Sequence, residues 1–369
     1  MQNAPSAFWV DTQSKIFGDN SSSNSVAAVL ADAASRSPAP LVVFIVYDLP
    51  NRDCAAHSSN GELCCAYNAD RTCDYGASGD CNDGIAEYQT KYVNALVSLF
   101  ARYHTQVPIV AIVEPDSLPN LATNQGNPHC GNVATNAAYK TGVAYAVQQI
   151  AALAPSVAIY LDAGHGGWLG WESNAQAFAQ LVSSLGVTQH LRGFATNTAG
   201  YQPLGVACAA FDWCLPNQNH SLDACCADTC KLASQYNPAV SELQYVQVLA
   251  HYFQPTFAAA RFVIDTGRNG VADMRSNCAN WCNVRGAGAG RLPTNETALP
   301  LVDAYFWLKT PGECDGCTQT LPNGSACPRF DTMCGSVDSL GSARGEPRAP
   351  EAGRWFDYEV QMLARNAHF

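Results

Sequence analysis

The sequence predicts an α/β fold in which parallel strands alternate with helices and close into a barrel. Six apolar runs of strand length are separated by segments with helical patterns, and this alternation favours a parallel sheet. Nearly every run ends in polar residues, glycine or tryptophan, as is typical of a barrel with its site at the carboxyl face. Because no linker rich in Pro, Ser or Thr divides the chain, we expect residues 1–369 to form one domain.

The elements are expected in a regular order along the chain. The predicted strands cover residues 41–47, 107–113, 157–161, 191–195, 261–264 and 303–308; they are short and continuously apolar. The predicted helices cover residues 25–35, 84–103, 134–153, 175–185, 241–259 and 355–366. Residues 54–83 are expected to form a loop with five cysteines, and a loop of this length in a compact domain is usually functional.

Composition and charge narrow the class of protein. Of 369 residues 47% are apolar, and the net charge of -11 argues against a nucleic-acid or anionic-membrane surface. A neutral or cationic substrate agrees better with this charge. No apolar run approaches the roughly 20 residues of a membrane span. Met1 is not followed by an apolar signal region, so we expect a mature form that carries a start codon.

Cysteine is the strongest compositional signal, with 17 in the chain. Zinc spacing is conceivable around Cys225, Cys226 and Cys230, or at Cys314 and Cys317, but paired zinc-ribbon modules are absent from the sequence. We favour disulfides, which place the protein in an oxidising, extracellular compartment. The odd count leaves one thiol unpaired. Glycosylation sequons agree with secretion; they start at Asn20, Asn219, Asn295 and Asn323.

Two carboxylates follow directly after the second predicted strand. Glu114 and Asp116 lie two residues apart, so in extended geometry both face one side. Such a pair suits general acid–base catalysis, because one charge makes its neighbour harder to ionise. The alternative is that Asp116 only caps the next segment.

The strand ends together collect carboxylates and aromatic side chains, a combination that predicts a sugar-binding cleft. For each tryptophan, core packing is the alternative, although Trp168 and Trp171 lie in a glycine-rich loop. His165 has no second histidine nearby, which favours a hydrogen-bonding role over metal binding. The strand-end residues are Asp53, Glu114, Asp116, Asp162, Asp265, Glu313 and Asp315, with Tyr47, Trp168, Trp171 and Trp281.

Several motifs, in order along almost the whole chain, resemble glycoside hydrolase family 6. They are Tyr47-Asp-Leu-Pro-Asn-Arg-Asp53-Cys, Ser59-Asn-Gly-Glu62, Glu114-Pro-Asp116-Ser, Leu161-Asp-Ala-Gly-His-Gly-Gly-Trp168-Leu-Gly-Trp171, Asp265-Thr-Gly-Arg-Asn-Gly, Trp281-Cys-Asn and Gly312-Glu-Cys-Asp315-Gly. The resemblance implies a secreted cellulase that hydrolyses β-1,4-glucosidic bonds with inversion. It also implies a distorted, TIM-like parallel α/β barrel of about seven strands, with long disulfide-braced loops over the site.

The same resemblance implies roles for individual residues. Asp116 would be the general acid, and Asp53 would keep the proton on it. Asp315 would be the base, acting on water through the position of Ser59, and Tyr47 would lie against the distorted sugar. The other implied substrate-binding residues are Trp9, Asp11, Asp162, His165, Trp168, Trp171, Asn197, Trp281, Lys309 and Glu313.

The resemblance also implies disulfides Cys54–Cys130 and Cys282–Cys334, and leaves Cys314 as the candidate free thiol. The other pairings stay open. In the family that the chain resembles, long loops over the site accompany release of cellobiose from non-reducing ends. The long loops after Asp53 and Asp315 therefore imply a cellobiohydrolase, and an endoglucanase is the alternative within the family. A protein that only binds sugar would require loss of the acid, and Asp116 is present. We expect a monomer that acts on cellulose and cello-oligosaccharides, without metal, cofactor or carbohydrate-binding module.

Overall fold

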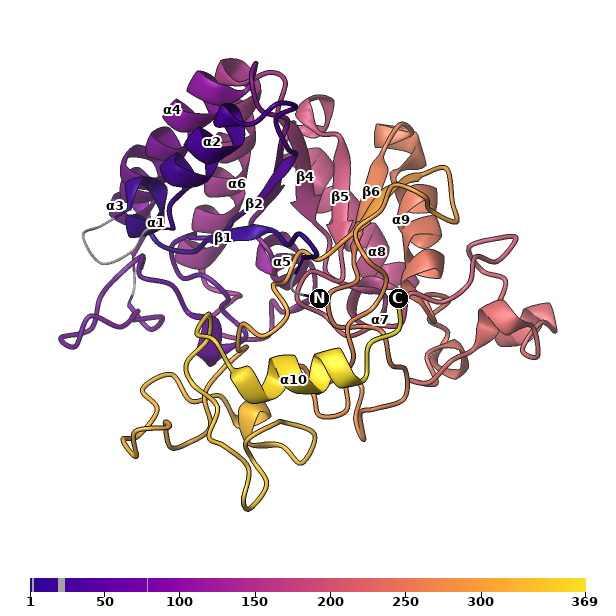
Figure 1. The fold of residues 1–369 in the computed structure, drawn as a ribbon. Helices are drawn as coiled ribbons and strands as arrows, with labels where there is room; N and C mark the ends of the chain where they lie inside the picture. The colour runs from indigo at the N-terminus through magenta and orange to yellow at the C-terminus, as the bar shows by residue number, and fades with distance from the viewer. Residues whose placement is uncertain (2, 19–23, 78) are drawn as a thin grey trace.

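Seven parallel strands form one sheet in the part of the chain described by the computed structural model, residues 1, 3–18, 24–77 and 79–369. The strands pair in chain order (Figure 1). Their bounds are β1 Phe8–Val10, β2 Val42–Val46, β3 Ile109–Val113, β4 Ala158–Asp162, β5 Gly193–Thr196, β6 Arg261–Asp265 and β7 Val302–Phe306. All six strands expected from the sequence are confirmed. The additional strand, β1, has three residues, too few to stand out as an apolar run.

The sheet curls into a distorted half-barrel. Its edge strands, β1 and β7, are joined by a single bridge between neighbouring residues and not by a continuous series of strand hydrogen bonds. Ser6 forms a parallel bridge with Trp307, and the Ala7 N–H donates to the Trp307 carbonyl at 2.9 Å. Beyond it, the Trp9 indole Nε1 donates to the Leu308 carbonyl at 2.8 Å. The predicted α/β barrel is therefore confirmed, with its distortion located between β1 and β7.

Helices cover the outer face of the sheet. Ser25, Asn132 and Ser241 start three of them by accepting a backbone N–H with the side-chain oxygen, the preferred N-cap arrangement. All six predicted helical segments are confirmed within a few residues. The helices are α1 Ser14–Phe17, α2 Val26–Ser35, α3 Asn82–Glu87, α4 Asn94–Tyr103, α5 Ser117–Thr123, α6 Val133–Leu153, α7 Gly166–Leu169, α8 Glu172–Ser184, α9 Glu242–Phe257 and α10 Asp357–Arg365.

A π-helical turn, Tyr88–Val93, joins α3 to α4 within the predicted helix 84–103. It places two buried tyrosines, Tyr88 and Tyr92, against the strand ends. The Tyr88 hydroxyl donates to Glu114 Oε1 at 2.7 Å, and the Tyr92 hydroxyl donates to the Val10 carbonyl. Through these two tyrosines the π-helical turn connects the helix layer to the carboxyl end of the sheet.

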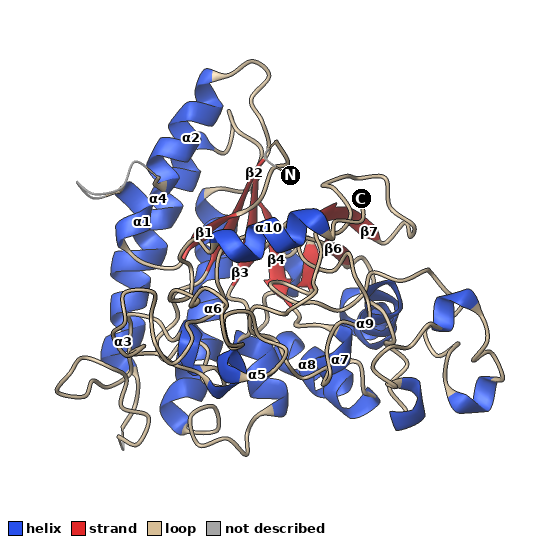
Figure 2. Cartoon of the chain, turned by 60° about the horizontal axis from the view of Figure 1, so that its bottom comes forward, coloured by secondary structure: helices blue, strands red, loops and turns tan. Residues whose placement is uncertain are grey.

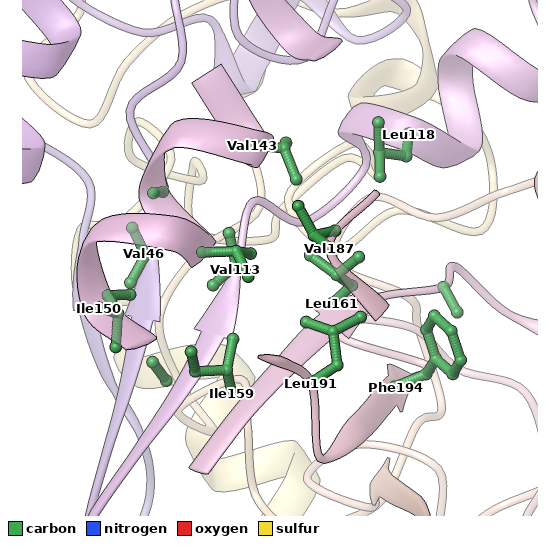
Figure 3. Packing of buried hydrophobic residues seen from close by; sticks show 14 of the residues in the cluster. Val46, Val113, Leu118, Val143, Ile150, Ile159, Leu161, Val187, Leu191 and Phe194 are labelled. Atoms are coloured by element: carbon green, nitrogen blue, oxygen red, sulfur yellow. The ribbon is translucent and has the colours of Figure 1, made fainter. Parts of the chain in front are cut away.

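Two hydrophobic clusters lie on opposite faces of the sheet. Along β2, Phe44 and Val46 face the helices, whereas Val43 and Ile45 face the barrel interior, as the alternation of a strand requires. Figure 3 shows the helix-facing core, where Val113 and Leu161 from the sheet meet Val143 and Ile150 from α6. This packing holds the strand ends at fixed positions.

Eight disulfides brace the loops at the carboxyl end. Both expected pairs, Cys54–Cys130 and Cys282–Cys334, are present, and Cys314 is the buried free thiol. Of the cysteines considered as zinc ligands, all except Cys314 form disulfides. The remaining disulfides are Cys64–Cys73, Cys65–Cys81, Cys208–Cys225, Cys214–Cys226, Cys230–Cys278 and Cys317–Cys327.

Three of the four predicted glycosylation sites lie on the surface of the described structure. Asn219, Asn295 and Asn323 are exposed, whereas Asn20 lies outside the described residues. Among the described residues, no helix combines the length and the apolar character that a bilayer crossing requires.

Candidate active site

The carboxyl ends of the strands bring acidic residues to one end of the sheet. Asp162 and Asp265 are the last residues of β4 and β6, and Glu114 follows β3 directly. Asp53, Glu114 and Asp116 adopt left-handed backbone conformations, with φ of 53°, 52° and 62°. For residues other than glycine this conformation costs about 1–2 kcal/mol each. The surrounding structure must therefore enforce it, as is common at functional sites.

Asp116 lies at the N-cap position of α5, yet its side chain makes no capping hydrogen bond there. Its backbone instead holds it: the Asp116 N–H donates to Asp162 Oδ2 at 3.1 Å, and Asn120 Nδ2 donates to the Asp116 carbonyl at 2.6 Å. Burial, and then the charges of Asp53, Asp162 and Asp315, raise the pKa of Asp116 well above its usual value. The arrangement favours a carboxyl that keeps its proton, rather than a helix cap.

Asp53 accepts hydrogen bonds from two side chains that the sequence also singled out. The Tyr47 hydroxyl donates to Asp53 Oδ2 at 3.2 Å, and the Ser59 hydroxyl donates to the same oxygen. Burial raises the pKa of Asp53 to about 6, against the opposing effects of Ser59, Tyr47 and Arg52. Above that pH Asp53 is ionised, and its charge makes proton loss from Asp116 harder.

Glu114 is turned away from this arrangement. It is buried and accepts hydrogen bonds from Tyr88 Oη, the Asp48 N–H and the Leu49 N–H at 2.7, 3.2 and 3.4 Å. Burial raises its pKa to about 7. The expectation that Glu114 and Asp116 face one side is wrong, because the extended backbone ends at Val113 and both residues are left-handed. Glu114 instead fixes the loop that follows β2.

Asp315 is held by donors from separate loops. Arg268 Nη1 lies 2.8 and 2.7 Å from its two oxygens, the Tyr201 hydroxyl donates at 3.0 Å and the Asn283 N–H at 2.9 Å. Lys309 Nζ is 3.9 Å away. The Arg268 guanidinium lies 4.2 Å from the centre of the Tyr201 ring. These contacts fix the orientation of the Asp315 carboxyl.

A second group of expected residues lies between the two edges of the sheet. Lys309 Nζ is 5.1 Å from the centre of a Trp9 ring, and Trp9 packs edge-on against Tyr47 with ring centres 5.3 Å apart. Asp11 pairs with Lys15 at 2.6 Å. Glu313 is half-buried, and burial raises its pKa despite Lys309 and Lys15. An aromatic face, a cation and carboxylates therefore adjoin one another here.

Three further expected residues lie at or after the end of β4, and Trp281 lies after β6. His165 is half-buried; burial, and then the charge of Arg275, lower its pKa to about 3, so it is neutral. Trp168 and Trp281 are half-buried, and Trp168 Nε1 donates to Thr123 Oγ1 at 2.8 Å. Asp162 is buried and also accepts from the Gly164 N–H at 3.0 Å, and burial raises its pKa to about 6.

Two expected sugar contacts are engaged in packing. Trp171 packs against the cluster of cysteines at residues 208–226, and its Nε1 donates to the Gln235 carbonyl at 3.1 Å. Asn197 is buried, and its amide donates to the carbonyls of Asp265 and Gln202 at 3.0 and 3.3 Å. In this structure both side chains hold loops in place.

Three residues that donate hydrogen bonds to Asp315, namely Arg268, Tyr201 and Asn283, are not among the predicted site residues. Arg268 lies in the motif that begins at Asp265, and Asn283 lies in the motif that begins at Trp281; membership of these motifs is the signal that points to both residues. Tyr201 and Glu359 carry no comparable signal. Glu359 reaches Arg268 at 3.5 Å from α10, far along the chain.

Comparison with known proteins agrees with this geometry. A family model described as "Glycosyl hydrolases family 6" matches residues 1–367. The chain belongs to glycosyl hydrolase family 6. "Exoglucanase 3" of Agaricus bisporus is 38% identical over 368 residues, which cover 99% of this chain and 70% of the relative. "Probable 1,4-beta-D-glucan cellobiohydrolase C" of Aspergillus fumigatus is 36% identical, covering 99% of this chain and 69% of the relative.

Solved structures of family 6 share the fold. Cellobiohydrolase II (Cel6A) from Humicola insolens, in complex with glucose and cellotetraose, superposes with a TM-score of 0.76 and is 32% identical, covering 99% of this chain and 88% of that one. The catalytic domain of Cellulomonas fimi Cel6B gives a TM-score of 0.79 at 29% identity, covering 99% and 86%. The family match spans all of the site residues described above.

Proposed function

We propose that this chain is an inverting cellobiohydrolase that cleaves β-1,4-glucosidic bonds in cellulose and releases cellobiose from non-reducing ends. The relatives named exoglucanase and cellobiohydrolase support the substrate. We further propose that residues 1–369 act as one secreted, monomeric catalytic domain. The disulfides support secretion, and the contribution of residues from Trp9 to Asp315 to one site supports a single domain.

The contact between two loops beside Asp53 carries the proposal of attack at chain ends. Arg329 Nη1 donates to the Asn60 carbonyl at 2.8 Å, and the His57 N–H donates to Asp331 Oδ2 at 2.8 Å. Ser59, whose hydroxyl donates to Asp53, lies between His57 and Asn60, so this contact is beside Asp53. Loops joined in this way roof a cleft, and a roofed cleft admits a polymer by its end.

Asp116 acts as the general acid in this proposal. It donates its proton to the glycosidic oxygen as the bond from that oxygen to the anomeric carbon breaks. Ionised Asp53 stabilises the positive charge that develops on the sugar ring, and it holds the proton on Asp116 until substrate is bound. Tyr47, which bonds to Asp53, lies against the ring at the point of cleavage.

Water attacks the anomeric carbon from the opposite face. Its oxygen forms the new bond, and its proton passes to Asp315. The Ser59 hydroxyl donates to Asp53, so its oxygen remains available to accept a hydrogen bond from a water in the relay. Inversion requires the two carboxyls to stand roughly 6.5–9.5 Å apart with room for water.

Aromatic and charged side chains bind the neighbouring sugar units. Trp9 offers an aromatic surface, with Lys309 beside it for hydroxyl groups. Trp168 and Trp281 supply further surfaces for stacking, and Asp11, Asp162, His165 and Glu313 supply polar contacts. Trp171 and Asn197 act mainly by shaping the loops that carry these residues.

Soluble carboxymethylcellulose distinguishes the two modes of attack. A cellobiohydrolase releases reducing ends with little loss of viscosity, whereas an endoglucanase, the alternative, lowers viscosity rapidly with few new ends. A rapid viscosity drop would refute attack at chain ends. Proton NMR of the first product tests stereochemistry: the α-anomer is expected, and the β-anomer would contradict inversion.

A further inference from the structure

A buried glutamate on the C-terminal helix contacts the group that holds Asp315. Glu359 of α10 is fully buried. Both of its carboxyl oxygens lack a hydrogen-bond partner among the described residues, and Oε1 lies 3.5 Å from Arg268 Nη1. The same nitrogen is 2.7 Å from Asp315 Oδ2. Two carboxyl groups therefore share one guanidinium nitrogen.

The position of Glu359 is set by backbone contacts on both sides of it. Before α10, the Phe356 N–H donates to the Gly312 carbonyl at 2.8 Å, and the Cys314 N–H donates to the Arg354 carbonyl at 2.9 Å. After Glu359, the Ala289 N–H donates to the Leu363 carbonyl at 3.0 Å. Figures 1 and 2 place α10 at the end of the sheet where β3 leads into α5. The helix is thus joined to the loop that carries Asp315.

We propose that Glu359 is a positioning residue for water activation, which competes with Asp315 for Arg268 and so weakens the hold of Arg268 on the Asp315 carboxyl. The inference rests on the proposed function, in which Asp315 is the base. A carboxylate held by a guanidinium through both oxygens is a poor proton acceptor. A second negative charge at the same nitrogen weakens that hold and repels Asp315.

The groups around Glu359 make its charge sensitive to pH. Burial, and then the charge of Asp315, raise the pKa of Glu359 to about 7, although Arg268 and Lys309 oppose them. Tyr201 and Cys314 also face it, and burial raises the pKa of both well above the neutral range, so both stay uncharged there. The charge on Glu359 therefore changes near neutral pH, and the strength of its competition for Arg268 changes with it.

Hydrolysis of β-cellobiosyl fluoride tests this inference, because fluoride leaves without a proton from Asp116 and the rate reports water attack. The variants are Glu359→Gln and, as a matched control, Asp357→Asn, which removes an exposed carboxylate from the same helix. We expect kcat of Glu359→Gln to fall about tenfold above pH 7 with little change in KM. We expect the rate of the wild type and of the control to rise near pH 7, and this rise should be lost in Glu359→Gln.

The outcomes separate this inference from the proposed function. If the wild type cleaves neither the fluoride nor cellotetraose, the proposed function fails. If it cleaves both and Glu359→Gln keeps its rate and pH profile, this inference alone is wrong. Should Glu359→Gln not fold, Glu359→Asp retains the charge and should keep the rise near pH 7. A wild-type rate that is level through neutral pH would overturn the inference without any variant.

Discussion

At the scale of single residues, environment separates carboxyl groups that are close in sequence. Glu114 has three hydrogen-bond donors and is buried, whereas Asp116, two residues later, has neighbouring negative charges and no capping bond. The two carboxyl groups therefore differ in role: Glu114 holds the loop that follows β2, whereas Asp116 is the candidate proton donor. Groups whose pKa values are pushed apart by their surroundings are the usual basis of acid–base assignments.

Asp116→Ala should remove the general acid while leaving cellulose binding largely intact. We expect kcat on cellotetraose to fall about 10²- to 10⁴-fold, with KM little changed. Activity on β-cellobiosyl fluoride should survive, because fluoride departs without protonation. Asp32→Ala, at an exposed ion pair on α2, is the control. Near-normal rates on cellotetraose would reject Asp116 as the acid.

The pH dependence of kcat should report Asp53. Its pKa is raised to about 6, so the ionised form that supports Asp116 is present above that pH and lost as pH falls through it. The rate should therefore rise through about pH 6 and fall again when Asp116 ionises. In Asp53→Asn the charge that holds the proton on Asp116 is gone, so the alkaline limb should move to lower pH. An unmoved alkaline limb in that variant would contradict the assignment.

At the scale of elements, loops from distant parts of the chain meet beside Asp53, where we propose that they roof the site. The loop after β2 meets the loop after Asp315 through His57, Asn60, Arg329 and Asp331. Arg329 also pairs with Glu351 at 2.9 Å, which ties the roof to the segment that leads into α10. Under the proposed function, access to the site thus depends on a few polar contacts between these loops.

Arg329→Ala should loosen this roof and raise endo-type activity. We expect a faster loss of carboxymethylcellulose viscosity per reducing end released, with kcat on cellotetraose within about twofold, because Arg329 does not contact the carboxyls that act on the bond. Arg36→Ala, at an exposed ion pair far from the loops in sequence, is the matched control. An unchanged ratio of viscosity loss to ends released would show that these contacts do not govern access.

At the scale of the whole molecule, many carboxyl groups are buried and carry raised pKa values. Burial is the largest cause in every case. Asp265, for example, accepts backbone N–H groups from Ala199, Gly267, Leu308 and Lys309, which joins the ends of β5, β6 and β7. The groups include Asp53, Asp162 and Asp265 with a pKa of about 6, Glu114 and Glu359 with a pKa of about 7, and Glu242 with a pKa of about 8; the pKa values of Asp48, Asp116 and Glu313 are raised as well.

These groups predict that the protein is more stable in mildly acidic solution. Between about pH 4 and 8 the native state binds more protons than the unfolded chain, whose carboxyls ionise near pH 4. The free energy of unfolding should therefore fall as pH rises through this range. Urea unfolding at pH 5, 6, 7 and 8 under non-reducing conditions measures it. A free energy of unfolding that increases toward pH 8 would mean that these carboxyls are not buried as described.

Local pattern was sufficient for much of the fold, and it also indicated many of the candidate site residues. Each long strand is an apolar run, and the helix starts at Ser25 and Ser241 carry their own capping side chains. Because parallel strands bring their carboxyl ends together, Asp53, Asp116 and Asp162 could be assigned to one site in advance. Disulfide partners beyond two pairs could not, since sequence spacing does not determine which sulfurs meet.

The order of strands and helices, the family and the identity of the carboxyls at the strand ends can all be predicted from the amino-acid sequence, because they depend on neighbours along the chain. Only the tertiary structure decided the meeting of β1 with β7, the contact between the roof loops and the set of donors around Asp315. Arg268, Asn283 and Glu359 converge there from three separate segments. Such contacts are set by how the packed elements lie in space, and no local periodicity records them.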